Sequence, residues 1–127
     1  MIDHVSVGVR DLAASAAFYD SLLSAIGYVK MHDREKTVGW GKPGKPHAEF
    51  WINVRPEMAK ISADTGTHIC LRAPDTQSVH AFHEAALKAG ATSCGAPGPR
   101  PEYTGGYYAA FIFDPDGNKI EVVTFVK

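Results

Sequence analysis

The chain has 127 residues, of which 45% are apolar, and its 13 basic and 14 acidic residues give a formal net charge of -1. This length and apolar content suit one compact domain that buries about two thirds of its unfolded surface. The balanced charge leaves no basic face for nucleic acid, and no apolar run approaches the roughly 18 residues of a membrane span. We therefore expect a soluble cytoplasmic protein. Its two cysteines, Cys70 and Cys94, lie far apart without a CxxC spacing, so we interpret them as reduced thiols, with a single bridge as the alternative.

The first half of the chain, residues 1–54, opens with a strand and a helix. Residues 2–9 alternate between valines on one face and small or polar residues, among them His4, on the other, as in a half-buried strand. A helix N-cap at Asp11 and the glycine at position 27 bound a predicted helix. Three further strands are predicted, at residues 28–32, 36–40 and 48–54.

Residues 55–65 have the composition of a connector, and residues 66–127 repeat the order of the first half. A strand at 67–73 precedes a helix that Asp75 caps and Gly90 ends. Three further strands are predicted, at residues 91–94, 107–113 and 119–125. The fold class is therefore α+β, built from two βαβββ modules of mixed sheet with the helices on the outside.

The two halves also match in sequence. At a constant offset of 64 residues His68 falls on His4, and seven pairs of similar residues follow this register. Towards the end of each half the offset widens to 72, which places Glu121 on Glu49. Each half thus contributes one histidine early and one carboxylate late.

One helix covers only one face of each sheet, so we expect the opposite faces to share a cleft. Strand alternation points His4, Glu49, His68 and Glu121 into that cleft. Burying an unpaired carboxylate costs several kcal/mol unless a cation or donors compensate it. Two imidazoles and two carboxylates suit a divalent metal, and a solvated polar cleft is the alternative.

Other side chains are candidates for lining a substrate pocket. Trp51 and Asn53 share the face of Glu49, and Cys70 shares that of His68, where we interpret it as a small filling residue. His32 and His47 lie near loop ends, where we expect them to be solvated. Two tyrosines complete the pocket candidates, Tyr103 and Tyr107.

Four segments carry a resemblance to a known family: His4–Asp11, Ala17–Tyr19, Gly66–Ile69 and Asp114–Glu121. With these the whole chain resembles the vicinal oxygen chelate superfamily, which includes glyoxalase I, fosfomycin resistance enzymes, extradiol dioxygenases and bleomycin-binding proteins. The resemblance implies a cleft of paired βαβββ modules in which a metal chelates neighbouring oxygens of the substrate and stabilises an enediolate.

The order of ligands in glyoxalase I, His, Glu, His, Glu, is similar to His4, Glu49, His68 and Glu121. By that resemblance these four hold a divalent metal (Ni, Zn, Co, Mn or Fe), and either Glu49 or Glu121 moves a proton between adjacent carbons. Asn53 matches a glutathione-contacting position, but Gly8 and Thr104 stand where basic residues would grip glutathione. The resemblance therefore does not extend to a complete glutathione site.

The leading hypothesis is a metal-dependent, glyoxalase-like lyase or isomerase with a small-molecule substrate. One alternative is a binding or resistance protein that sequesters an aromatic or cationic molecule without chemistry. Another is an Fe(II) dioxygenase, although the second carboxylate disfavours it. We expect a homodimer, with the cleft formed either within one chain or between chains that exchange modules.

Overall fold

The computed structural model describes residues 1–127, and its first half is one βαβββ module. The Asp11 carboxylate accepts a hydrogen bond from the backbone N–H of Ala14 and caps the first helix, as predicted. The helix is followed by Gly27, whose positive φ of 87° ends the turn at little cost. The elements of this module are β1 (Val5–Val9), α1 (Leu12–Ser24), β2 (Val29–Asp33), β3 (Thr37–Gly41) and β4 (Phe50–Val54).

The second half repeats this order, which confirms the predicted βαβββ pattern. Asp75 caps its helix through the backbone N–H of Ser78. The elements are β5 (His68–Arg72), α2 (Thr76–Lys88), β6 (Thr92–Pro99), β7 (Tyr107–Phe113) and β8 (Lys119–Phe125). The strand predicted at 91–94 is longer than expected, because β6 goes on pairing with β7 through irregular positions as far as Pro99.

Each module forms its own four-stranded mixed sheet, in the orders β1-β4-β3-β2 and β5-β8-β7-β6. The first strand of each module pairs in parallel with the last, and the remaining pairs are antiparallel. In β4 the side chains alternate as predicted: Phe50 and Ile52 are buried, while Trp51 and Asn53 lie on the other face.

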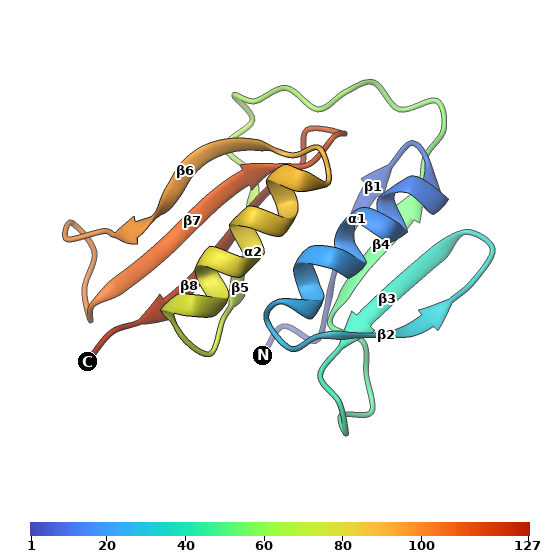
Figure 1. The fold of residues 1–127 in the computed structure, drawn as a ribbon. Coiled ribbons are helices and arrows are strands. Elements are labelled where there is room, and N and C mark those ends of the chain that lie inside the picture. The colour runs from blue at the N-terminus through green and yellow to red at the C-terminus, as the bar shows by residue number, and fades with distance from the viewer.

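The two helices lie side by side, and each covers one face of its own sheet (Figure 1). Their buried side chains, among them Tyr19, Leu22 and Phe82, belong to a single core that also takes in both sheets. The two modules are therefore joined through the helices, and the face of each sheet away from its helix is left open for a site.

A second junction between the modules is the turn between β7 and β8. Asp114 in this turn accepts a hydrogen bond of 2.5 Å from the buried Tyr19 hydroxyl of α1. Asn118 donates to the Gly8 carbonyl in β1 at 2.9 Å, and Arg10 binds Asp116 at 2.7 Å. The Asp-Pro-Asp-Gly-Asn segment therefore fastens the second module to the first.

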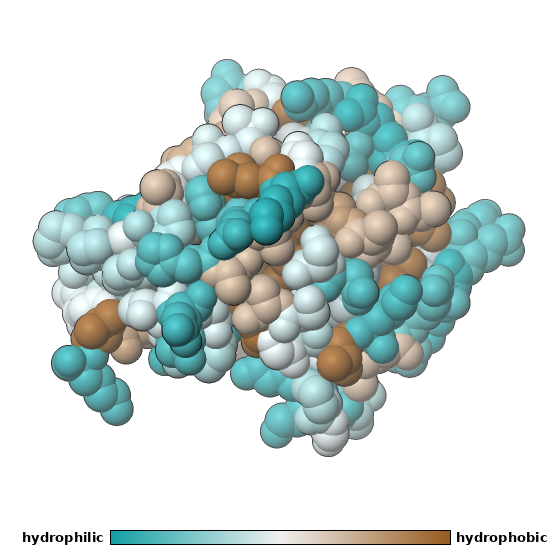
Figure 2. All heavy atoms as spheres, in the orientation of Figure 1, coloured by the Kyte–Doolittle hydropathy of each residue, from teal (hydrophilic) through white to brown (hydrophobic).

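Hydrophilic side chains predominate on the helical side of the molecule, where hydrophobic ones occur in small groups (Figure 2). Neither helix has the length and apolar character needed to cross a bilayer. Both cysteines, Cys70 and Cys94, are free thiols.

Candidate functional site

The open face of the second sheet carries a hollow of about 670 Å³ that holds several predicted site residues. His68 enters it from the start of β5 and Glu121 from β8, and Tyr107 lies at the start of β7. The rest of its lining consists of Glu102, Tyr103, Thr104, Phe111, Lys119 and Phe125. We call this the second-sheet hollow.

Glu121 is the most deeply placed ionisable side chain of this hollow, with 3% of its surface exposed. His68 Nε2 lies 3.1 Å from its Oε1, and the Tyr107 hydroxyl donates a hydrogen bond to its Oε2. A buried carboxylate needs such partners, because its desolvation would otherwise cost several kcal/mol. The three side chains form a preassembled acid–base cluster on the open face of the sheet.

Cys70 lies directly across from Glu121 in the parallel pairing of β5 and β8. Burial, together with the nearby Glu121 carboxylate, raises the pKa of the Cys70 thiol to about 12. Burial and the hydrogen bond to Glu121 likewise raise the pKa of Tyr107. Cys70 is therefore protonated at neutral pH and is no activated nucleophile. Tyr107 also stays protonated, and its hydroxyl donates a hydrogen bond to Glu121.

A second hollow of about 400 Å³ lies on the open face of the first sheet, and only first-module residues line it. His4 is here, with its Nδ1 2.7 Å from the Asp3 carboxylate. The hollow also gathers His32 and His47, which the sequence placed at solvated loop ends. The other lining residues are Arg34, Thr37, Ala48 and Trp51. We call this the first-sheet hollow.

Strand pairing corrects the alignment of the two carboxylates. Ser6 pairs with Trp51 in the first sheet, and Cys70, its equivalent at the offset of 64, pairs with Glu121 in the second. Trp51 is therefore the structural equivalent of Glu121, at an offset of 70 rather than 72. By the same register Glu49 is the equivalent of Lys119.

Glu49 differs from Glu121 in its contacts as well. No hydrogen bond or ion pair joins it to His4, whose partner is Asp3. Glu49 interacts instead with Tyr28, where burial and the Glu49 charge raise the pKa of the Tyr28 hydroxyl to about 12. Whether Glu49 binds a metal stays a prediction.

Asn53, a predicted pocket residue, lies outside both hollows. Its side-chain amide donates to the Ser6 hydroxyl at 2.8 Å and to the Val7 carbonyl at 3.2 Å, and its oxygen accepts from Arg55. These contacts tie β4 to β1, so in this structure Asn53 supports the sheet.

The structure brings the predicted metal ligands together only in part. His68 and Glu121 are in contact, but no group of three or more possible ligands forms within the chain. His4 belongs to the first-sheet hollow and His68 to the second-sheet hollow. One chain by itself therefore presents two donors from the second module, fewer than a protein metal site normally uses.

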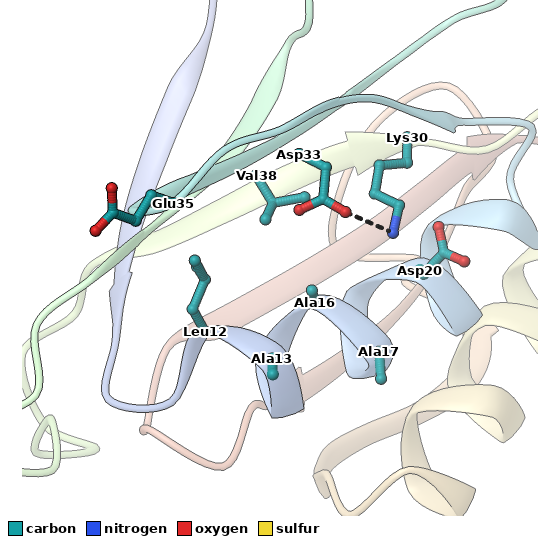
Figure 3. A pocket seen from close by; sticks show the side chains of 9 residues that line it. All are labelled: Leu12, Ala13, Ala16, Ala17, Asp20, Lys30, Asp33, Glu35 and Val38. Carbon is teal, nitrogen blue, oxygen red and sulfur yellow. Dashed lines mark hydrogen bonds and ion pairs between the residues drawn. The ribbon is translucent and has the colours of Figure 1, made fainter.

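A third hollow, of about 650 Å³, lies on the helix side of the first sheet between α1 and strands β2 and β3 (Figure 3). Its floor is apolar, and Lys30 pairs with Asp33 at 3.5 Å across its rim. Asp20 is already used by the Trp40 indole N–H, at 3.0 Å. None of the predicted site residues lines this hollow, so the open faces of the sheets remain the candidate site.

The family relationship agrees with this arrangement of paired modules. The family model described as the glyoxalase/bleomycin resistance protein/dioxygenase superfamily matches residues 1–122. The chain belongs to this superfamily. No curated protein matches the chain at a significant level.

Solved structures support the membership. A glyoxalase/bleomycin resistance protein from Albidiferax ferrireducens is 32% identical, with a TM-score of 0.79 and 95% of each chain covered. A superfamily enzyme from Burkholderia phytofirmans is 18% identical, with a TM-score of 0.71 and 98% of each chain covered. A mutant of glyoxalase I from Zea mays is 22% identical, with a TM-score of 0.72, 94% of this chain and 44% of that chain being covered. The last two show the shared fold.

Proposed function

We propose that this superfamily member is a metal-dependent enzyme that moves a proton on a small substrate carrying two neighbouring oxygens. The observation that carries the proposal is the buried Glu121 carboxylate, held by His68 and Tyr107 in a hollow of about 670 Å³. A carboxylate, an imidazole and a protonated phenol at one spot supply both a base and a hydrogen-bond donor.

The proposed metal ligands are His68 and Glu121 of one chain and His4 of a second copy of the chain. The two hollows are each lined by one module, and the helices of both modules share one core, which supports a second copy of the chain as the source of the facing hollow. The functional unit is then a homodimer with two clefts, and its cytoplasmic location stays a prediction. A bound divalent metal would polarise the neighbouring substrate oxygens and lower the pKa of the adjacent C–H group.

The side chains of this protein have separate roles in the proposed reaction. Glu121 accepts or returns the proton. Its Oε2 accepts a hydrogen bond from Tyr107, and it can exchange this bond for one to the substrate. Tyr107 orients the carboxylate and stays protonated. Lys119, which lines the same hollow, attracts an anionic substrate.

An Fe(II) dioxygenase is the second candidate function. The equivalence of Trp51 with Glu121 in the strand pairing favours it. With Trp51 at the position equivalent to Glu121, the ligand set reduces to two histidines and one carboxylate, which leaves open coordination positions as in non-haem iron oxygenases. Oxygen consumption by the Fe(II)-loaded protein with a catechol would support this candidate, and oxygen-independent turnover would support proton transfer.

Three glutamate substitutions test the metal site. We expect Glu121→Gln to weaken binding of Ni, Zn, Mn or Co by at least about 100-fold, since it removes an anionic ligand that is nearly fully buried. Glu49→Gln should change the affinity by no more than about twofold if the site has three ligands, whereas the four-ligand set predicts a loss like that of Glu121→Gln. Metal content is measured by mass spectrometry after loading and dialysis.

Glu84→Gln is the matched control, because Glu84 is exposed on α2 and pairs only with Lys88. It should bind metal like the unsubstituted protein. Failure of the unsubstituted protein to retain any of the four metals would refute the metal-dependent enzyme. The sequestering protein without chemistry would then remain, and ligand-induced thermal stabilisation in the presence of chelator would identify it.

A further inference from the structure

The floor of the first-sheet hollow is an aromatic surface that the proposed metal chemistry does not use. The rings of Trp51 and His32 lie nearly parallel, at an interplanar angle of 8° with 5.2 Å between their centroids. Gly39 of β3 stands between them, paired with His32 of β2 on one side and Trp51 of β4 on the other. We call the Trp51 and His32 rings, together with Gly39, the aromatic platform.

Gly39 is the residue that allows the indole to lie across the sheet. A Cβ at this position would approach the Trp51 ring atoms to 2.8 Å, closer than real contacts allow. In the second sheet Phe111 takes the place of Gly39, since it pairs with Glu121 as Gly39 pairs with Trp51. The two halves of the repeat have thus diverged, one into an acid–base cluster and the other into a ring surface.

A cation lies over the indole of this surface. The guanidinium carbon of Arg34 is 5.2 Å from the Trp51 ring centroid. Its side chain is exposed and makes no hydrogen bond or ion pair within the chain, whereas the guanidinium of Arg10 binds Asp116. An exposed planar guanidinium with unused donors over a stacked ring pair is suited to bind a carboxylate whose own ring packs against that pair.

We propose that the aromatic platform binds the ring of a small aromatic carboxylate and that Arg34 binds its carboxylate group. The inference rests on the proposed function, because the platform shares its hollow with His4, and it names the substrate class of that cleft. The hollow of about 400 Å³ is within the usual range for small-molecule sites. Because His4 lines the same hollow, a substrate held in this way would lie in the cleft of the proposed metal site.

Titration with benzoate, followed through the indole N–H signals in nitrogen-15 NMR, tests the proposal. The chain has two tryptophans, and Trp40 is fully buried with its N–H bound to Asp20, so it is an internal reference. Benzoate should shift the Trp51 signal saturably and leave the Trp40 signal in place. Cyclohexanecarboxylate, with the same charge and no π system, should bind about tenfold more weakly or not at all.

Arg34→Met should weaken benzoate binding by about tenfold or more, because it removes charge-assisted hydrogen bonds. Arg72→Met is the matched control: Arg72 also lies over a ring, that of Phe125, but in the second module. Both side chains are exposed, so both variants should keep the amide spectrum of the folded protein. Gly39→Ala should also weaken binding, because it displaces the indole.

Three results would overturn the inference: no shift of Trp51, equal binding of the saturated acid, or equal losses in Arg34→Met and Arg72→Met. All titrations are carried out with chelator and repeated with metal. Benzoate binding that persists while metal binding fails would refute the proposed function and keep the aromatic platform as a binding site. Metal binding without benzoate binding would refute the platform alone.

Discussion

Trp51 and Glu121 occupy equivalent places in the repeat but have opposite chemistry. Glu121 is a buried carboxylate that needs its partners His68 and Tyr107, whereas Trp51 presents a ring over Gly39. Since strand pairing, and not sequence similarity, defines this equivalence, the glutamate that most resembles Glu121 along the chain, Glu49, is not its counterpart. At this one position of the repeat, the second module therefore carries a buried carboxylate and the first an indole.

Removal of the Tyr19 hydroxyl tests the contact between α1 and the β7–β8 turn. We expect Tyr19→Phe to lower the free energy of unfolding by about 1–3 kcal/mol, because the buried Asp114 carboxylate loses one of its donors. That hydrogen bond lowers the pKa of Asp114, against the larger effect of burial, which raises it. Tyr19→Phe therefore raises this pKa further, and its destabilisation should shrink under acid conditions in which Asp114 is protonated.

Urea unfolding followed by circular dichroism measures both effects. Tyr103→Phe is the control, because Tyr103 is 52% exposed, and it should change the free energy of unfolding by less than about 0.5 kcal/mol. A Tyr19→Phe protein as stable as the control at neutral pH would contradict the role of this contact.

At the scale of elements, the β7–β8 turn and the connector hold the modules together. The backbone N–H of Ile61, in the connector, donates to the Asp116 carbonyl at 2.9 Å. The next residue of the turn, Gly117, has a φ of 94°, and a Cβ there would lie 2.4 Å from the Ile61 carbonyl oxygen. Gly117 is therefore required both by its backbone conformation and by the close approach of the connector.

Substitution of Gly117 by alanine should disrupt this junction. Gly44 is the matched site, because it also has a positive φ, 81°, but a Cβ there would meet nothing within 4 Å. Gly44→Ala incurs only the backbone strain, about 1–2 kcal/mol. Gly117→Ala should lose about 1–3 kcal/mol more, since the connector must move to relieve the clash. Thermal and urea unfolding of the two variants compare them directly, and equal losses would show that the connector yields freely.

At the scale of the whole molecule, the packing of the helices decides how the two open sheet faces are arranged. The helices α1 and α2 lie side by side (Figure 1) and share a single core. The two open sheet faces carry separate hollows, each lined by one module. The predicted ligands His4 and His68 are therefore divided between the hollows. A cleft that joins modules of different chains resolves this division, and it can be tested with mixed dimers.

Mixed dimers distinguish a cleft between chains from a cleft within a chain. Co-expressed His4→Ala and Glu121→Gln chains, carrying different affinity tags, are purified as the heterodimer, and the bound metal is counted. If the cleft joins modules of different chains, this heterodimer has one intact site and binds about one metal, while each homodimeric variant binds none. If the cleft lies within a chain, the heterodimer binds none.

The reciprocal control places both substitutions on one chain and pairs it with an unsubstituted chain. A cleft between chains then has no intact site, whereas a cleft within a chain leaves one. The two combinations thus give opposite results under the two arrangements, and one metal in the second combination would refute the proposed dimeric cleft.

The amino-acid sequence by itself determined the βαβββ modules and the residue types of the site. Three features are local, because they depend on backbone geometry within a few residues. They are the side-chain alternation in β1 and β4, the helix caps at Asp11 and Asp75, and the contrast of His68 and Glu121 with their apolar neighbours. They could be interpreted without knowledge of what packs against them.

The tertiary structure decided the strand register and the placement of the candidate site residues. The pairing of Ser6 with Trp51 joins residues 45 positions apart in the chain. A gap in the alignment of the two halves shifts the matched residues by two positions, from an offset of 72 to one of 70. Such a shift leaves the alternation of side chains along each strand unchanged. The packing of α1 against α2 is equally non-local, since it depends on which apolar faces meet in the folded chain. For these reasons only the folded molecule showed that Trp51 is the repeat equivalent of Glu121. It also showed that the two hollows are separate.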